Sequence, residues 1–240
     1  MKTLAAALIL LAGLAAPALA ASDAKPVVEL FTSQGCSSCP PADAYLVKLA
    51  RRGDVIALSE HVDYWNYIGW ADPFSDAGGT ERQQAYRVAL GGKYVYTPQM
   101  VIDGAAEAVG SETGAVEKRI AAARRVPRVT LAVAHSSDGP VVRIAAGQKL
   151  AQGATVWEFD LDARHSTEIA RGENKGVTLT NANVVRRIAS RGTYAGEAME
   201  IAIDAARLRA DGRTGCAILV QSADGGRIFG AVLVDLAEGS

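Results

Sequence analysis

Two cysteines separated by two residues are the part of this sequence best suited to chemistry. Cys36 and Cys39 stand in the segment LFTSQGCSSCPPADAYL, and the third cysteine, Cys216, lies far away in an apolar run. A C-x-x-C pair can act as a redox dithiol, supply two ligands to a metal ion, or form an inert disulfide. A disulfide across so short a loop constrains little of the unfolded chain, so a purely structural crosslink explains the pair poorly.

The place of the pair in the chain favours redox chemistry. It follows an apolar run at residues 27–32 that predicts a strand, and it precedes residues 42–52, whose apolar spacing predicts a helix. A cysteine at a helix N-terminus faces unpaired N–H groups, which stabilise the thiolate. We therefore expect Cys36 to be the nucleophile and Cys39 to resolve the mixed disulfide that Cys36 forms.

Two prolines directly after the pair leave the start of this helix open. Proline suits the first helical turn but removes N–H donors beyond it. If the helix begins late, Cys36 lies further from the helix dipole and Asp43 becomes the N-cap, which is the arrangement we expect.

Further candidates come from the neighbouring strands. Glu29 interrupts an apolar strand seven residues before Cys36, and a buried carboxylate there could accept the proton of Cys39. The alternative is a glutamate that faces solvent or caps a neighbouring group. We expect Glu29 to have the catalytic role.

Residues 60–74, EHVDYWNYIGWADPF, concentrate aromatic side chains in a loop after a second predicted strand at residues 55–63. In open α/β sheets, ligands bind beyond the carboxyl ends of the strands, which is where this loop begins. The loop could form a substrate groove beside the dithiol, with Trp65 in contact with the substrate and His61 or Asp63 moving protons. It could equally be a hydrophobic cluster against which the second half of the chain docks.

The hydrophobic periodicity divides the chain into two halves, one with alternating strands and helices and one with strands alone. Up to residue 126 the order β-α-β-α-β-β-α is predicted, including a helix at 80–92 with Thr80 as its N-cap. From residue 127 to 240, seven runs alternate with period two and are separated by turn signals, which predicts an antiparallel β-sandwich-like domain. We place the boundary between residues 21–126 and 127–240.

The ends of the chain and its charge bear on location and partners. Residues 1–20 have a basic start, an apolar stretch and the small-residue end Ala18–Ala20, which predicts a cleaved signal peptide and a periplasmic or secreted protein. Twenty-five Lys and Arg against 26 Asp and Glu, with no basic run among aromatics, argue against nucleic acid as a partner. We expect no membrane span after signal cleavage.

The segment YTPQMVIDG, residues 96–104, adds a resemblance to the dithiol. A strand, a C-x-x-C pair and a helix, followed later by Thr-Pro opening a strand, resemble the thioredoxin-like superfamily. The resemblance implies that Thr97–Pro98 is a cis peptide beside Cys36. It also implies that Tyr96, Thr97 and Pro98 bind the substrate.

Four segments together narrow the resemblance. ELFTSQGCSSCPPAD, HVDYWNYIGW, TPQMVIDG and RGENKGVTLTNANVVR are similar to a family of secreted bacterial proteins known as domain of unknown function 1223. That resemblance implies a thioredoxin-like domain followed by a β-rich part, and it implies no activity.

These observations predict an exported thiol–disulfide oxidoreductase that acts on protein thiols and disulfides. The dithiol itself holds the electrons, so no cofactor is expected. Two alternatives stay open. One is a copper or zinc chaperone that uses the C-x-x-C pair, although this pair supplies two ligands where zinc takes three or four. The other is a binding module in which the thioredoxin-like part is a scaffold.

Overall fold

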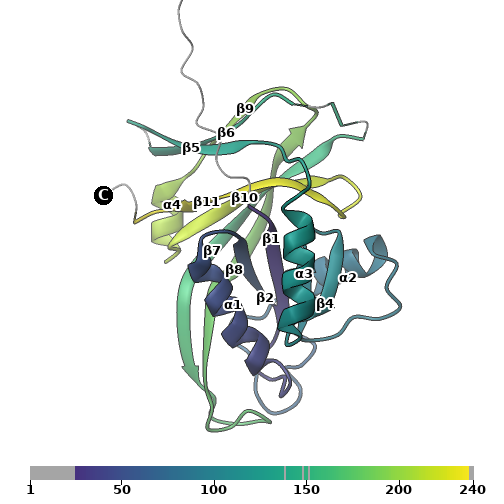
Figure 1. Cartoon of the computed structure of the whole chain (residues 1–240). Helices are drawn as coiled ribbons and strands as arrows, with labels where there is room; N and C mark the ends of the chain where they lie inside the picture. Colours follow the sequence, from purple (N-terminus) through teal and green to yellow (C-terminus); the bar gives the residue numbers. More distant parts are fainter. Residues whose placement is uncertain (1–24, 138, 148, 151, 238–240) are drawn as a thin grey trace, which may run out of the picture.

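The computed structural model describes residues 25–237 apart from positions 138, 148 and 151, so the predicted signal peptide at 1–20 lies outside the described residues. The chain forms a mixed α/β fold with one large sheet and one small antiparallel sheet (Figure 1). The strands are β1 (Val27–Thr32), β2 (Ile56–His61), β3 (Gln99–Ile102), β4 (Ala106–Val109), β5 (Leu131–Ser136), β6 (Gly139–Ile144), β7 (Ala154–Glu168), β8 (Thr178–Tyr194), β9 (Met199–Ala202), β10 (Gly215–Ser222) and β11 (Ile228–Asp235). The helices are α1 (Pro40–Arg52), α2 (Ala77–Ala89), α3 (Thr113–Ala123) and α4 (Ala205–Ala210).

The large sheet runs through both halves of the chain. Its strand order is β11-β10-β7-β8-β2-β1-β3-β4, in which β1 is parallel to β2 and antiparallel to β3. The first seven elements have the predicted order, and the seven predicted C-terminal strands are all present. The predicted domain boundary at 126/127 falls between α3 and β5, and the sheet crosses it because β8 pairs with β2.

Helices cover both faces of the N-terminal half of this sheet. Because side chains alternate along a strand, Val28 and Leu30 of β1 point to one face and Phe31 points to the other. Val28 and Leu30 pack in the cluster that contains residues of α1 and α3. Phe31 packs edge-on against Tyr86 of α2, with 5.9 Å between the ring centroids. The sheet thus separates an α1 face from an α2 face.

The small sheet, in the order β5-β6-β9, packs over the C-terminal half of the large one. Leu131 and Val142 of the small sheet share a core with Val156 and Ile218 of the large sheet. Helix α4, which the sequence pattern did not predict, lies against this core through Leu208. None of the helices formed by the described residues is long and apolar enough to cross a membrane.

The N-terminus of α2 corrects one sequence prediction. The helix begins at Ala77, and the side chain of Asp76 accepts a hydrogen bond from the Gly79 N–H at 2.9 Å, so Asp76 is the N-cap. Thr80 is therefore inside the helix, and its hydroxyl donates to Asp63 at 2.6 Å. Asp76 caps more effectively here because it is the last extended residue before the helical turn.

Strands β7 and β8 form a long hairpin, in which pairing continues to Glu168 and Thr178. In Figure 1 the hairpin extends from the small sheet to the opposite end of the molecule, alongside α1. Its tip therefore lies next to the loop that follows β1.

The shared sheet predicts that the N-terminal segment does not fold alone. Ile56 and Leu58 of β2 are buried against Phe159 and Leu219 from the second half. Exposing these two side chains costs roughly 3–6 kcal/mol, against a total stability of about 5–15 kcal/mol. A fragment of residues 25–126 should lack the cooperative thermal unfolding of the 25–240 chain when both are followed by circular dichroism. A monomeric fragment with a sharp unfolding transition would contradict this expectation.

Candidate functional site

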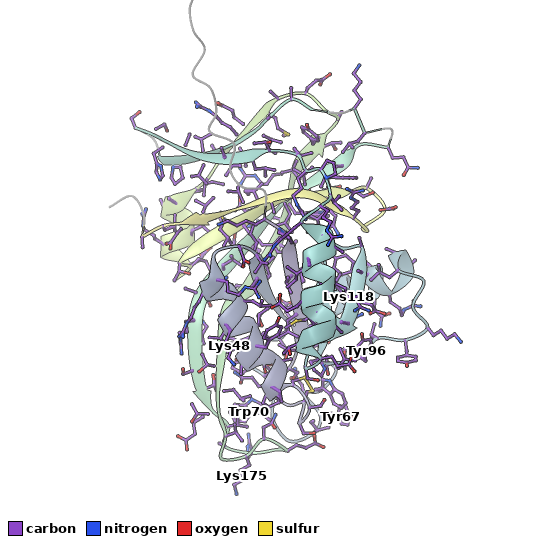
Figure 2. All side chains as sticks on the ribbon, viewed as in Figure 1. Lys48, Tyr67, Trp70, Tyr96, Lys118 and Lys175 are labelled. Atoms are coloured by element: carbon purple, nitrogen blue, oxygen red, sulfur yellow. A yellow bond between two sulfur atoms is a disulfide. The ribbon has the colours of Figure 1, made fainter. Side chains whose placement is uncertain are left out.

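The two cysteines form a disulfide in the loop between β1 and α1. Cys36 is 2% exposed and Cys39 is fully buried. Figure 2 draws the disulfide at the same end of the molecule as the labelled side chains of Tyr67, Trp70 and Tyr96. Within the described residues, no group of three or more His, Cys, Asp or Glu side chains is arranged to hold a metal ion.

Helix α1 starts directly after the dithiol. Pro40 and Pro41 occupy its first turn and Cys39 is the N-cap, so the expectation that Asp43 caps a delayed helix is wrong. Proline fits here because the N–H groups of the first turn have no partner within the helix. Cys36 lies three residues before the N-cap, so its sulfur depends on other donors as well as on the helix terminus.

Hydroxyl groups supply those donors. Thr97 donates to the Cys36 sulfur at 3.3 Å, and the Ser38 hydroxyl lies 3.3 Å from the same sulfur. Trp65 fixes Thr97, since its indole N–H donates to the Thr97 hydroxyl at 2.8 Å. The Thr97–Pro98 peptide is cis, as predicted. The structure therefore brings the predicted residues Thr97 and Trp65 to the Cys36–Cys39 pair, with Pro98 joined to Thr97 by the cis peptide.

Gln34 anchors the loop just before the dithiol. Its backbone N–H donates to Asp72 at 2.7 Å, and its side-chain amide donates to Asn181 at 3.2 Å. Its side-chain oxygen accepts from the Trp70 indole at 3.2 Å, and its backbone oxygen accepts from Asn174 at 2.9 Å. The loop at 60–74 and the β7–β8 hairpin therefore both hold this segment. The sequence left a substrate groove and a docking cluster as alternatives for the aromatic loop, and the loop contacts both the dithiol segment and the hairpin.

A buried carboxyl lies on the dithiol side of α1. Asp43 follows Cys39 by four residues, which places both on the same side of the helix. Thr32 donates to Asp43 Oδ1 at 2.9 Å, while Oδ2 has no partner among the described residues. Burial raises the pKa of Asp43 to about 7, although the nearby His61 acts in the opposite direction.

His61 belongs to the same buried group. Its Nδ1 lies 2.7 Å from Asp72 Oδ2, and both side chains are fully buried. Burial would raise the pKa of Asp72, but the attraction of His61 and the hydrogen bonds to the carboxylate lower it overall. The Nε2 atom of His61 has no hydrogen-bond partner among the described residues. His61 therefore lowers the pKa of Asp43 through its charge, without a hydrogen bond to it. The hydrogen bond of His61 is made to Asp72.

Three other predicted residues have partners away from the sulfur atoms. Glu29 lies on the α2 face, where it accepts from Arg82 Nε at 2.5 Å and from the Tyr86 hydroxyl. Asp63 bonds to the first turn of α2, as described above. Tyr96 directs its hydroxyl toward Glu107 at 3.4 Å, and burial is the main cause that raises the pKa of this tyrosine.

A family model matches residues 27–221, which covers the sheet from β1 to β10 and the whole dithiol site. The chain belongs to the family described as "Protein of unknown function (DUF1223)". The crystal structure of Protein AGR_C_4864 from Agrobacterium tumefaciens is 33% identical to this DUF1223 protein, with a TM-score of 0.77. The alignment covers 90% of this chain and 96% of that chain.

A second solved structure is similar in fold alone. The structure described as HBP35 of Porphyromonas gingivalis is 12% identical to this DUF1223 chain, with a TM-score of 0.58. The alignment covers 90% of this chain and 76% of that chain. No curated protein is significantly similar to the sequence.

Sequence reasoning gave too little weight to the asparagines of the segment RGENKGVTLTNAN. Turn chemistry explained them, and residues 171–176 do form the hairpin turn. Asn174 and Asn181 nevertheless bond to the dithiol segment. The available signal was the grouping of three asparagines, Asn174, Asn181 and Asn183, in this one segment.

The raised pKa of Asp43 predicts a pH-dependent stability difference. The folded state binds this proton more tightly than the unfolded state, so the contribution of Asp43 to wild-type stability falls as pH rises from about 4 to about 7 and then levels off. Asp43→Asn lacks this loss, so its stability relative to wild type should increase by on the order of 3–4 kcal/mol from about pH 4 to pH 8. Urea unfolding of both oxidised proteins across this range measures the difference.

His61 and Asp72, the two titratable groups that act on Asp43, are present in both proteins, so the comparison reports the Asp43 carboxyl together with its interactions with these two groups. Parallel stability profiles for the two proteins would mean that Asp43 has an ordinary pKa.

Proposed function

We propose that this protein is an exported thiol–disulfide oxidoreductase that exchanges electrons with protein thiols and disulfides. The observation that carries the proposal is the disulfide between Cys36 and Cys39, with the Thr97 hydroxyl donating to the Cys36 sulfur. The same hydroxyl can donate to a Cys36 thiolate once the disulfide is reduced, which favours the nucleophilic form. Export rests on the pattern of residues 1–20.

A thioredoxin-like assignment of residues 27–123 is part of the proposal. It is supported by the order β-α-β-α-β-β-α, by the parallel β1–β2 pair and by the antiparallel β1–β3 and β3–β4 pairs. The C-terminal part is proposed to be sandwich-like, because two sheets share one core there.

The proposed exchange proceeds in two displacements at sulfur. The Cys36 thiolate attacks one sulfur of a substrate disulfide, which forms a Cys36–substrate bond and releases the other substrate sulfur as a thiolate. Cys39 then loses its proton and attacks the Cys36 sulfur. The Cys36–Cys39 disulfide forms again, the second substrate sulfur leaves as a thiolate, and two electrons have passed to the substrate. The same steps in reverse oxidise a substrate dithiol.

Asp43 is the group we assign to the proton of Cys39. Cys39 is fully buried, so water has no direct access to its thiol. Asp43 lies on the same side of α1 and has one unpartnered carboxyl oxygen. A carboxyl with a pKa near 7 can both accept and return a proton at neutral pH. Glu29 is less suited to this role because Arg82 and Tyr86 already bond to both of its oxygens.

The backbone of Thr97 offers hydrogen bonds to an extended substrate. Across the described part of the chain, its N–H donates no hydrogen bond, and its carbonyl accepts one long bond of 3.4 Å from Ser38. Tyr67, which is 81% exposed, provides an apolar surface at the same end of the molecule (Figure 2). These groups support a polypeptide substrate held in an extended conformation.

Cysteine variants test the proposal directly. Cys36→Ser should abolish the reduction of insulin disulfides by the reduced protein, because the attacking thiolate is removed and the remaining Cys39 is fully buried. Cys39→Ser should accumulate a mixed disulfide with insulin, visible on a non-reducing gel. The control is Cys216→Ser, since Cys216 is fully buried in β10 and burial raises the pKa of its thiol. Equal insulin reduction by wild type and Cys36→Ser would refute the proposed function.

The proton acceptor has a test of its own. Asp43→Asn should slow the resolution of the mixed disulfide by roughly 100-fold while the initial attack by Cys36 keeps its rate. Rapid quenching with acid, followed by mass spectrometry of the mixed disulfide, separates the two steps. If Glu29→Gln slows resolution and Asp43→Asn does not, the acceptor is Glu29, as the sequence predicted.

A further inference from the structure

The side chain of Asn174 reaches the dithiol loop from the far end of the chain. Its amide nitrogen donates to the carbonyl oxygens of Gln34 and Cys36, both at 2.9 Å. These partners lie 140 and 138 residues away in the sequence, and Asn174 is 6% exposed. Both hydrogens of the amide are therefore used on the loop that contains the disulfide.

The Cys36 carbonyl is held by two donors. Besides Asn174, the N–H of Cys39 donates to it at 3.2 Å, which closes the turn from Cys36 to Cys39. On the other side of the turn, the N–H of Cys36 donates to the Ser33 carbonyl at 3.1 Å. Hydrogen bonds thus restrain the same four-residue turn that the disulfide restrains.

The hairpin that carries Asn174 is itself fixed in place. Gly172 has φ +77°, and a Cβ built there would lie 3.2 Å from Trp70 Cβ and 3.3 Å from the Ile68 carbonyl oxygen. Further along β8, Asn183 donates to the Ala57 carbonyl at 2.9 Å. These contacts hold the hairpin against the 60–74 loop and against β2, independently of the dithiol turn.

We propose that Asn174 is a positioning residue that fixes the equilibrium between the dithiol and disulfide forms of Cys36 and Cys39. After reduction, the two carbonyl hydrogen bonds keep the turn in the shape that the disulfide requires. The two sulfur atoms then stay near each other, and less conformational entropy is lost when the bond forms again. Without Asn174 the reduced turn opens more readily and disulfide formation becomes less favourable.

The equilibrium is defined by a balanced reaction with glutathione. Oxidised glutathione takes two electrons from the dithiol, the Cys36–Cys39 bond forms, and the two thiol protons are carried by two molecules of reduced glutathione. This property belongs to the dithiol alone and needs no protein substrate. If the protein fails to reduce insulin, the effect of Asn174 on the dithiol–disulfide equilibrium can still be measured. If Asn174 has no such effect, the proposed oxidoreductase function can still be correct.

The test measures the equilibrium constant of the Cys36–Cys39 pair in glutathione buffers of varied ratio, using the 25–240 chain. Asn174→Ala should lower the constant for disulfide formation about tenfold, which raises the reduction potential by about 30 mV. The matched control is Asn183→Gly, which removes the same kind of hydrogen bond from the same hairpin but away from the dithiol. Glycine is chosen because Asn183 has φ 47°, where alanine would be strained. The control should keep the wild-type constant.

A second measurement applies to the wild-type protein and does not need a variant to fold. By reciprocity, the disulfide should strengthen the contacts of Asn174, so reduction should speed amide hydrogen exchange at the hairpin tip. The amides of Lys175, Gly176 and Val177 report on it, since their hydrogen bonds close the turn. An unchanged constant in Asn174→Ala, an equal change in Asn183→Gly, or identical exchange at the tip in both redox states would overturn the proposal.

Discussion

Most of the dithiol loop is buried, with Ser37 and Ser38 exposed, and the carbonyl groups of Gln34 and Cys36 belong to buried residues. Buried polar groups of this kind need donors from the protein. Asn174 supplies them for Gln34 and Cys36, and it stands at the tip of a hairpin formed by β7 and β8. The hairpin reaches that point because β8 joins the sheet beside β2. The need of the Gln34 and Cys36 carbonyl groups for donors is thus met only because the sheet continues through β8 and the β7–β8 hairpin is long enough to bring Asn174 to the cysteines.

The sheet also separates two buried groups of ionisable side chains. On the α1 face, Asp43 and His61 are buried, and each has an atom without a hydrogen-bond partner among the described residues. On the α2 face, Arg82 and Tyr86 bond to both oxygens of Glu29, which holds α2 against the sheet. Glu60 lies on the same face, 3.9 Å from Arg82; burial raises its pKa to about 8, and its Oε1 atom has no hydrogen-bond partner among the described residues. The alternation of side chains along β1 and β2 decides which strand residues face α1 and which face α2.

Much of the fold could be predicted because its signals are local. Period-two alternation gave every C-terminal strand, and the order of the first seven elements followed from runs of a few residues each. The sequence predictions of helix N-caps are wrong where several neighbouring residues are suited to cap the same helix. The capping pattern predicts Thr80 as an N-cap, whereas Asp76, four residues earlier, is the extended residue whose side chain caps the helix. The two prolines predict a delayed helix capped by Asp43, whereas the helix begins at the first of them, Pro40.

The sequence by itself determined the dithiol, the strand and helix on either side of it, and Thr97 and Pro98 as its neighbours. These depend on residue types, short spacing and a resemblance to known proteins. Tertiary structure alone decided that Glu29 faces α2 and bonds to Arg82 and Tyr86, and that Asn174 holds the Cys36 carbonyl. The face to which a strand residue points depends on what packs there, and a contact across 138 residues depends on how two strands pair. Neither leaves a local pattern in the chain, because hydrogen bonds between distant segments form only after the sheet brings those segments together.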